Sequence, residues 1–567
     1  MFIVCISDIL KASDLFVRCL ESERVDFIFG LPGEENADMV MSLLNSKIQF
    51  ILTRHEQSAA FMADVYGRLT DKVGVCLATL GPGATNLTTG IANANMDRSR
   101  VLAITGQTDV NSLHKESHQN MDVITMFKPI TKWNWSIRNA DSIPEVIRRS
   151  FKISLEEKVG ATHIELPQDI AKMNSNILPI PVTETLRSLP NMFLIKKAVQ
   201  LILNAKKPLI LVGNGCIREN ATFYVRKFVE LTGICSMNTF MAKGVISDKS
   251  ERHLHTIGIK EADHALLAME ESDLVIAIGY DLVEYSPKFW NSKLDKKIIH
   301  IDFTPSEVDT YYPPIVEIAA DIELTIDSIL SELEKEKQKD PCVSCYPFHD
   351  MPALFRKIKT EISQNILEYT SDSSYPIKPE KLVTDVRKIL DDKDIVISDV
   401  GVHKLWIAKI YDTYYPNTCI IPNGFCSMGF SLPGALAAQL IFPEKKIVAM
   451  CGDGSFLMNV QELETAVRLK LPIIIVVWVD KEFGLIALKQ KMEFGQSGFT
   501  KFENPDFVML AESFGAIGFK VNSVPEFEIV LKKAIKSIDV PVVIAVDVDY
   551  SRNTILLNDE YCNLPSK

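Results

Sequence analysis

The amino-acid sequence predicts an α/β protein made of three domains, each with a doubly wound parallel sheet. Short runs of branched and apolar residues alternate with amphipathic stretches of helical spacing along most of the chain. A proline-rich passage and a charged passage divide this alternation into three segments. The length of 567 residues is also too great for one ordinary hydrophobic core.

The first segment, residues 7–175, carries strand-like runs separated by helical stretches. The runs are residues 25–29, 50–52, 74–78, 101–104 and 161–166. Strands that alternate with helices are expected to be parallel, because each crossover returns the chain to the same edge of the sheet. The following passage, residues 178–190, contains three prolines and is predicted to be a linker.

The second and third segments, residues 192–333 and 377–550, repeat the pattern. Strand-like runs in the second segment cover residues 208–212, 274–278 and 297–301. The charged run 332–340 and the stretch to residue 347 are predicted to form another linker, because such runs are usually solvated. In the third segment we expect strands at 395–398, 446–451 and 471–479 and a helix at 456–469.

Composition argues against several functional classes. The formal net charge is −12 without any stripe of lysine and arginine, which argues against nucleic acid and anionic membranes as partners. No apolar run approaches the roughly 18 residues that a membrane helix needs. The N-terminal residues show no basic leader or cleavage site, so we expect a cytoplasmic protein whose 11 cysteines are reduced.

The most informative motif is the turn from Gly452 to Ser455, which a second aspartate follows at position 480. Asp453 and Asp480 both end predicted strands joined by a crossover, so their carboxylates should lie side by side at the carboxyl edge of the sheet. Glycines let a phosphate approach the backbone, and aspartates supply oxygen ligands suited to Mg²⁺. A lone Gly-Asp-Gly is often an ordinary turn, but the spaced second aspartate favours a metal-bound diphosphate.

These motifs resemble the cofactor signature of thiamine-diphosphate enzymes, in which Gly-Asp-Gly precedes a residue pair that is usually Asn-Asn. Here the pair is Val479-Asp480, which keeps an oxygen ligand and adds a negative charge. The resemblance implies a Mg²⁺ site formed by Asp453, Asp480 and the main-chain carbonyl of Glu482. It extends through all three segments, as pyrimidine-binding, central and diphosphate-binding domains.

Glu56 is the first candidate catalytic residue. It stands where a predicted strand gives way to a helix, next to the apolar run Ala59-Ala60-Phe61. A glutamate at such a point can simply complement the positive end of the helix. In the thiamine-diphosphate family, a glutamate here bonds to the aminopyrimidine ring and promotes proton removal from the thiazolium carbon. The resemblance gives Glu56 that role.

The resemblance also implies further site residues. Gln119 is expected beside the substrate, and His118 is a less certain neighbour. The expected cofactor contacts come from loops of the first and third segments: Pro32, Gly33, Gly83, Asn86, Val402, His403, Ser427, Met428, Gly452, Gly454 and Ser455. Without the resemblance, most of these positions fit tight turns, helix starts and core packing equally well.

One segment and one residue indicate which branch of the family this sequence resembles. The segment from Gly279 to Trp290 lacks both arginines of the flavin-dependent biosynthetic acetohydroxyacid synthases, so we expect no FAD. It is similar instead to the flavin-independent, catabolic acetolactate synthases. Lys489 aligns where the biosynthetic enzymes have a tryptophan that favours 2-ketobutyrate, so pyruvate is the expected second substrate.

The resemblance therefore implies condensation of two pyruvates to 2-acetolactate and CO₂ by a homodimer or homotetramer. One departure stands against it: Glu34-Glu35 replace a usual Ala-Lys, and carboxylates near an anionic keto acid would disfavour its binding. Another thiamine-dependent carboligase or decarboxylase for a different 2-keto acid is thus an alternative. A non-catalytic scaffold is a further one, which the joint presence of Glu56, Asp453 and Asp480 disfavours.

Overall fold

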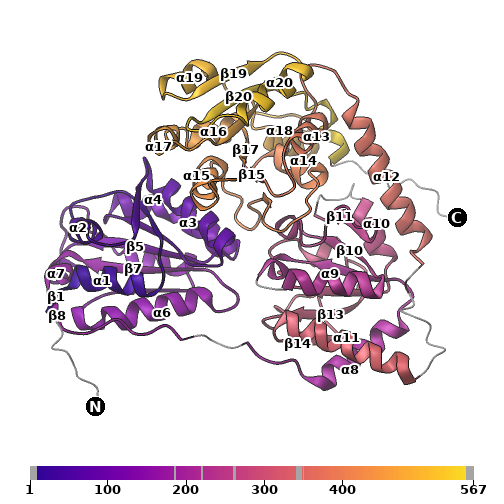
Figure 1. Ribbon diagram of the computed structural model, residues 1–567, viewed down its shortest axis with the longest axis horizontal. Helices are drawn as coiled ribbons and strands as arrows, with labels where there is room; N and C mark the ends of the chain where they lie inside the picture. Colours follow the sequence, from indigo (N-terminus) through magenta and orange to yellow (C-terminus); the bar gives the residue numbers. More distant parts are fainter. Residues whose placement is uncertain are drawn as a thin grey trace.

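The computed structural model describes residues 9–183, 187–218, 221–258, 264–339, 348 and 350–556. Its helices and strands form three lobes, which follow the chain from indigo through magenta to yellow in Figure 1. Each lobe is built on a six-stranded sheet in which helices connect parallel strands. The predicted fold class of three doubly wound parallel sheets is confirmed.

The N-terminal sheet has the strand order β3-β2-β4-β5-β7-β6, with all neighbours parallel. All five predicted strands are present, as β2 (Phe27–Gly30), β3 (Gln49–Leu52), β4 (Gly74–Ala78), β5 (Val101–Gln107) and β7 (Ala161–Pro167). The edge strand β6 (Trp133–Ser136) was not predicted, because its polar and aromatic residues are only partly buried. A two-stranded antiparallel ribbon joins β1 (Leu10–Lys11) to β8 (Asn174–Ser175).

Helices cover the N-terminal sheet, and two of them, α3 and α4, also face the C-terminal lobe in Figure 1. The helices are α1 (Ala12–Ser22), α2 (Ala37–Leu43), α3 (Glu56–Thr70), α4 (Pro82–Met96), α5 (Val123–Phe127), α6 (Ile143–Leu155) and α7 (Gln168–Lys172). The described part of the first predicted linker, residues 178–183 and 187–190, contains no helix or strand, in agreement with the prediction.

The central sheet has the order β11-β10-β9-β12-β13-β14, again parallel throughout. The predicted strands are β9 (Pro208–Val212), β12 (Leu274–Ile278) and β13 (Lys297–Asp302); three further strands are β10 (Cys235–Asn238), β11 (His253–Thr256) and β14 (Val316–Ala319). Its helices are α8 (Met192–Asn204), α9 (Ala221–Thr232), α10 (His264–Glu271) and α11 (Ile322–Lys339).

The second predicted linker is wrong over residues 332–339, which form the last turns of α11. Leu333 is buried in the central core, and Lys335 and Lys339 bond to carboxylates one turn earlier, at 3.1 and 2.7 Å. Charged residues at helical spacing thus continue the helix because an apolar stripe anchors it. Residues 340–347 of the predicted linker lie outside the described residues. A helix that was not predicted, α12 (Ala353–Thr370), then packs against α10 and α13.

The C-terminal sheet has the order β16-β15-β17-β18-β20-β19. Its strands are β15 (Ile395–Ser398), β16 (Cys419–Ile420), β17 (Ile447–Gly452), β18 (Ile474–Val479), β19 (Ile517–Val521) and β20 (Val542–Asp547). Its helices are α13 (Pro379–Ile389), α14 (Val402–Ile410), α15 (Ser431–Ile441), α16 (Asp453–Met458), α17 (Glu462–Arg468), α18 (Gly484–Phe494), α19 (Phe507–Ser513) and α20 (Val524–Ala534).

The prediction of a single helix at residues 456–469 is wrong. The chain breaks there into α16 and α17. At the break, the buried Asn459 side chain accepts a hydrogen bond from Ser58 Oγ (3.1 Å) and donates one to the Gly429 carbonyl (2.8 Å). Glu462 Oε1 accepts from the backbone N–H groups of Arg54 and His55, at 2.9 and 3.1 Å. Contacts with the N-terminal domain therefore fix two short helices instead of one.

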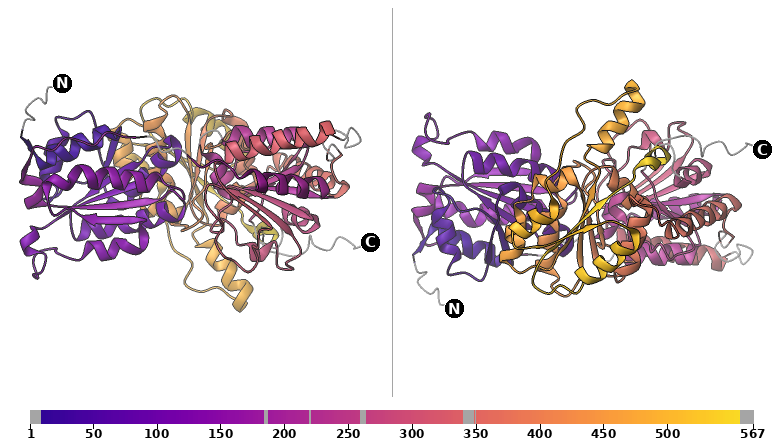
Figure 2. Two further views of the ribbon diagram at one scale, coloured as in Figure 1. Left: turned by 90° about the horizontal axis from the view of Figure 1, so that it is seen from below. Right: turned by 90° about the horizontal axis from the view of Figure 1, so that it is seen from above.

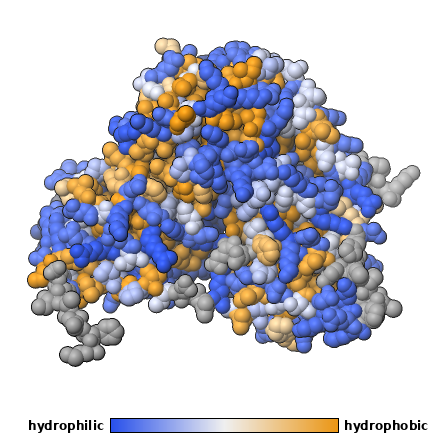
Figure 3. All heavy atoms as spheres, viewed as in Figure 1, coloured by the Kyte–Doolittle hydropathy of each residue, from blue (hydrophilic) through white to orange (hydrophobic). Residues whose placement is uncertain are grey.

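The N-terminal and C-terminal domains share one continuous hydrophobic core. Helices α3 and α15 pack against each other, with the rings of Phe61 and Phe430 edge to face at 5.5 Å. The views in Figure 2 show the two lobes in contact and α18 standing away from the body. On the face drawn in Figure 3, apolar side chains gather on the upper lobe and at its border with the left-hand lobe. Among the described helices, none is both long enough and apolar enough to cross a membrane.

Candidate active site

The carboxyl ends of β17 and β18 place two aspartates together. These strands are parallel neighbours with Gly452 opposite Trp478, so Asp453 and Asp480 leave the sheet at the same edge. The backbone N–H of Asp480 donates to Asp453 Oδ2 at 3.1 Å. The buried apolar strands thus bring the two predicted metal ligands side by side, as their spacing in the sequence indicated.

Asp453 is almost fully buried and its carboxylate is held by several donors. Oδ1 accepts from Gly454 N at 2.8 Å, and Oδ2 accepts from Lys481 N at 2.8 Å and Asn504 Nδ2 at 2.7 Å. Asn504 is a site residue that the sequence reasoning missed. Its Oδ1 is buried without a hydrogen-bond partner among the described residues, so it leaves an oxygen acceptor unused beside the aspartate pair.

Two carboxylates lie close together at this edge, that of Asp453 buried and that of Asp480 partly buried. Burial, followed by the charge of Asp453, raises the pKa of Asp480 to about 7. Glu482, the third predicted ligand, turns its carboxylate to Thr500 Oγ1 (2.8 Å), and its carbonyl accepts from Gly484 N (2.8 Å). The oxygen-rich pair fits a hard divalent cation, whose charge would favour the ionised form of both aspartates.

A pocket of about 100 Å³ lies next to this pair, at the N-termini of α14 and α16. Most of the predicted C-terminal cofactor contacts line it: Val402, His403, Met428, Gly452, Gly454 and Ser455. Ser427 does not; its backbone N–H instead points to Asn93 Oδ1 of the N-terminal domain at 3.4 Å. The structure therefore gathers all but one of these residues around a single pocket.

Two features of this pocket fit a diphosphate group. A Cβ on Gly454 would lie 2.9 Å from the Phe483 ring, so glycine keeps the backbone open there. The buried His403 Nε2 has no hydrogen-bond partner among the described residues. Burial lowers the pKa of His403 to about 3, so the ring is neutral and can donate one hydrogen bond to an anion.

The remaining predicted residues gather at the carboxyl edge of the N-terminal sheet. Apart from Gln119, we call them the Glu56 group: Glu56, Asn86, Gly83, Gly33 and Pro32. Asn86 Nδ2 donates to Glu56 Oε2 at 3.0 Å, and a Cβ on Gly83 would lie 3.4 Å from Glu56 Oε1. Gly33 packs so closely on Thr79 that a Cβ there would collide with it, and Thr79 also touches Gly83. Pro32, which precedes Gly33, is exposed at the same place.

Gln119 adjoins the same group through Gly81. A Cβ on Gly81, where φ is +49°, would lie 2.7 Å from the Gln119 carbonyl oxygen. Gln119 itself has a φ of +57°, unusual for a residue with a side chain, and it is exposed together with His118. The loop thus presents Gln119 at the surface beside the Glu56 group, although no direct contact joins them.

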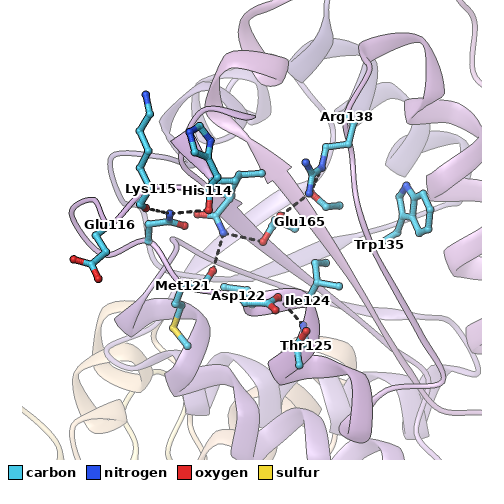
Figure 4. Close-up of a pocket in the computed structure, with 15 residues that line it drawn as sticks. His114, Lys115, Glu116, Met121, Asp122, Ile124, Thr125, Trp135, Arg138 and Glu165 are labelled. Atoms are coloured by element: carbon cyan, nitrogen blue, oxygen red, sulfur yellow. Dashed lines mark hydrogen bonds between the residues drawn. The ribbon is translucent and has the colours of Figure 1, made fainter. Parts of the chain in front are cut away.

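A second pocket of about 900 Å³, drawn in Figure 4, opens beyond the Gln119 loop. Arg138 and Glu165, which the sequence reasoning missed, approach each other in it. Arg138 Nε donates to Ser136 Oγ at 3.2 Å, and Ser136 Oγ and Gln107 Nε2 donate to the buried Glu165 carboxylate at 2.6 and 2.9 Å. Burial raises the pKa of Glu165. The pocket therefore offers a guanidinium group close to a buried carboxyl group.

The two carboxylates that depart from the family pattern occupy different environments. Glu34 is exposed, whereas Glu35 Oε2 accepts a hydrogen bond from Thr79 Oγ1 at 2.7 Å. Because Thr79 also touches Gly33 and Gly83, the Glu35 carboxylate stands next to the Glu56 group. The expectation that such a carboxylate can face the site therefore applies to Glu35 alone.

The segment after β12, which bears on the flavin prediction, joins all three domains. Asp281 forms an ion pair with Arg98 of the N-terminal domain at 2.7 Å. Glu284 Oε1 accepts from the backbone N–H of Asn214 at 2.9 Å, and the Glu284 carbonyl accepts from Asn423 of the C-terminal domain at 2.7 Å. These contacts tie the segment after β12 to both neighbouring domains.

The two groups of site residues do not meet within this chain. The described residues that line the pocket beside Asp453 all come from residues 400–550, and none comes from the N-terminal domain. Contacts between the two domains run through α3, α15 and α17, and through Asn93 and Asp97, which accept hydrogen bonds from the backbone of residues 423–427. The Glu56 group and the Asp453 pocket therefore belong to different domains of the chain.

Comparison with known proteins agrees with the three-domain organisation. Residues 10–126, 195–329 and 399–546 match the N-terminal TPP binding domain, the central domain and the C-terminal TPP binding domain of the thiamine pyrophosphate enzymes. The chain is similar to the acetolactate synthase of Bacillus subtilis (strain 168), with 35% identity over 97% of this chain and 95% of that protein. It is 32% identical to the catabolic acetolactate synthase of Raoultella terrigena, over 96% of both proteins. A probable acetolactate synthase large subunit of Methanococcus aeolicus is 32% identical over 93% of this chain and 90% of that protein. Because the matches cover all three domains in order, the chain belongs to the thiamine pyrophosphate enzyme family.

Proposed function

We propose that this protein is an acetolactate synthase that condenses two pyruvates to 2-acetolactate and CO₂ with thiamine diphosphate as cofactor. The similarity to enzymes of that name extends over nearly the whole chain, at 35% identity in the case of the Bacillus subtilis protein. The proposal depends above all on the pairing of Asp453 and Asp480 at one sheet edge, next to a glycine-lined pocket. That arrangement suits a diphosphate held through a cation.

Thiamine diphosphate, when bound, supplies an acidic thiazolium carbon and an electron sink for decarboxylation. Asp453 and Asp480, with the Glu482 carbonyl, would hold Mg²⁺, and His403 and the glycines would hold the diphosphate. Glu56, which Asn86 orients through a 3.0 Å hydrogen bond, would hold and move the proton that the aminopyrimidine exchanges. The chain's own residues thus bind, orient and shuttle protons.

We propose further that the active site forms between two copies of this chain, in a homodimer or homotetramer. The separation of the Glu56 group from the Asp453 pocket supports this, because neither half is complete alone. The protruding helix α18, which begins beside the Asp453 pocket, also exposes large apolar side chains: Ile486 (50%), Met492 (56%) and Phe494 (67%). Such side chains favour contact with another chain.

The first experiment is an assay of the purified protein with pyruvate, thiamine diphosphate and Mg²⁺, with and without added FAD. We expect acetolactate, detected as acetoin after acid treatment, at equal rates in both. Acetaldehyde in place of acetolactate would refute the carboligase proposal. A strict need for FAD would refute only the expected flavin independence.

Glu35 favours one alternative, a different 2-keto acid as substrate. Its carboxylate lies beside Thr79 and the Glu56 group, where it would repel the carboxylate of pyruvate. A comparison of kcat/KM for pyruvate, 2-ketobutyrate and larger 2-keto acids distinguishes the two. Pyruvate should give the highest value, and a clear preference for another acid would support the alternative.

A further inference from the structure

A cluster of four potential metal ligands lies away from the cofactor pocket, where the central and C-terminal domains meet. Asp248 stands in a turn before β11, His253 and His255 lie on β11, and Asp412 follows α14. Ligand atoms of Asp248, His255 and Asp412 all lie within 4.8 Å of one another. None of these residues has a role in the proposed reaction.

The contacts inside this cluster are close but are not hydrogen bonds. His255 Nδ1 lies 3.2 Å and His253 Nε2 lies 3.5 Å from Asp248 Oδ1. Nevertheless, Asp248 Oδ1 and His253 Nε2 have no hydrogen-bond partner among the described residues. Their side chains are only 2% and 0% exposed. Such orphaned buried atoms are costly, which calls for an explanation.

The separations match the edges of a tetrahedral metal site. Zinc binds histidine nitrogen at about 2.0–2.1 Å and carboxylate oxygen at about 2.0–2.2 Å, so neighbouring ligand atoms are about 3.3 Å apart. The observed 3.2 and 3.5 Å lie on either side of that value. Nitrogen and oxygen atoms that converge in this way are suitably placed to bind a cation.

A second layer of contacts orients the ligands. Thr413 donates to Asp248 Oδ2 from its backbone N–H (2.6 Å) and from Oγ1 (3.1 Å). The other ring nitrogen of His253 lies 3.3 Å from Ser236 Oγ. His255 has a φ of +63° at an irregularity in the β10–β11 pairing, which aims its ring.

The nearby ammonium groups leave the carboxylates available. Lys243 Nζ donates to Thr256 Oγ1 (3.2 Å) and the Ala408 carbonyl (3.1 Å), and Lys359 Nζ donates to the backbone carbonyl of Asp248 (3.2 Å). In the part of the chain that the structure describes, these two ammonium groups therefore bond to other oxygens and not to the side-chain carboxylates of Asp248 and Asp412.

We propose that Asp248, His255 and Asp412 bind one divalent transition-metal ion of the zinc class, with the His253 ring beside them. The imidazole nitrogen of His255 disfavours Mg²⁺ and Ca²⁺, which prefer all-oxygen sites, and favours Zn²⁺ or Co²⁺. The ion joins β11 to the segment after α14, the helix whose first residues Val402 and His403 line the cofactor pocket. It acts as a structural clamp behind that pocket.

The test uses the full chain, treated with EDTA and then reloaded with thiamine diphosphate and Mg²⁺. Addition of Co²⁺ should give one equivalent of tightly bound metal with the intense visible absorption of tetrahedral coordination, which Zn²⁺ then displaces. Elemental analysis after gel filtration gives the stoichiometry. Absence of these bands, or Co²⁺ bound only in octahedral form, would overturn the proposal.

Variants separate this site from nonspecific binding. Asp248→Asn and His255→Gln should weaken Zn²⁺ binding at least about 100-fold and abolish the tetrahedral bands. Asp392→Asn is the matched control, since this exposed carboxylate pairs with Lys249 in the same region at 2.7 Å; it should bind metal normally. Retained thiamine-diphosphate binding shows that each variant is folded. Equal Zn²⁺ affinity in variants and control would overturn the proposal, whatever the catalytic activity.

Discussion

At the scale of single residues, Glu56 is the sharpest test of the proposed chemistry. Substitution by glutamine keeps the size of the side chain but removes the carboxylate that holds the proton. We expect Glu56→Gln to lower the rate of acetolactate formation about 10²- to 10⁴-fold and to leave the affinity for thiamine diphosphate unchanged. Steady-state kinetics with a parallel cofactor titration measures both.

Glu34→Gln provides the control for this substitution, since Glu34 is an exposed carboxylate on a neighbouring loop. It should retain near-normal activity. If Glu56→Gln also stayed within about threefold of the unmodified protein, Glu56 would have no part in proton transfer.

Asp480 tests the metal site. Alanine removes one of two adjacent carboxylates, so we expect Asp480→Ala to need about 10- to 100-fold more Mg²⁺ for half-maximal cofactor binding. Titration calorimetry at fixed thiamine diphosphate measures this requirement. The control is Glu503→Gln, which removes an 86% exposed carboxylate paired with neighbouring Lys481. An unchanged Mg²⁺ requirement in Asp480→Ala would place the metal elsewhere.

At the scale of elements, the segment after β12 predicts a pH-dependent stability. Burial raises the pKa of Glu284 to about 8, whereas glutamate in an unfolded chain titrates near about 4.3. The folded state therefore holds this proton more tightly, and stability decreases as pH rises from about 4.5 to about 8. Glu284→Gln removes this dependence. Between pH 5 and pH 8, the protein with Glu284 should lose on the order of 3 kcal/mol relative to the variant.

Denaturant unfolding of both proteins at several pH values gives this difference, in which other titrating groups cancel. Glu307→Gln is the control, because this nearby carboxylate is 61% exposed and should not change the pH dependence. Parallel stability curves for the unmodified protein and Glu284→Gln would show that Glu284 is ionised when folded.

The elements also show where sequence patterns suffice. The runs 74–78, 208–212 and 395–398 coincide with strands because they are apolar, branched and buried on both faces. Strand β6 and the two-residue β16 give too little hydrophobic contrast over too few residues. The break between α16 and α17 depends on Ser58 and on the backbone at Arg54, some 400 positions earlier in the chain. No local pattern reports such partners.

In the candidate site, too, local sequence patterns placed some residues correctly and missed those whose position depends on distant parts of the chain. Asp453 and Asp480 were placed correctly beside each other because strand order alone brings them to one edge. Asn504 was missed because its approach to Asp453 depends on the fold of the loop after α18. Arg138 and Glu165 were missed because they meet only across β6 and β7, and β6 itself was not predicted. The role of Asp453 and Asp480 as metal ligands stays a prediction.

At the scale of the whole molecule, the separation of the two half-sites predicts complementation between inactive chains. Glu56→Gln and Asp453→Asn should each be almost inactive alone. In a mixed dimer, one of the two sites combines an intact Glu56 with an intact Asp453, so about half of the normal activity should return. Coexpression with two different affinity tags isolates the mixed species for assay.

Dimers that carry both substitutions on the same chain, paired with an unmodified chain, serve as the comparison. There each site would have one defective half, and activity should stay low. Activity of about half in this arrangement, with none in the first, would show that each chain builds its own site.

The hydrophobic core shared by the N-terminal and C-terminal domains has a consequence for biosynthesis. Phe61 and its neighbours on α3 are covered by α15, which the ribosome completes some 370 residues later. The ribosome adds about 5–20 residues per second, so an apolar face of the nascent N-terminal domain stays exposed to solvent for tens of seconds. We therefore expect the emerging chain to recruit chaperones during translation, and an isolated N-terminal fragment to aggregate.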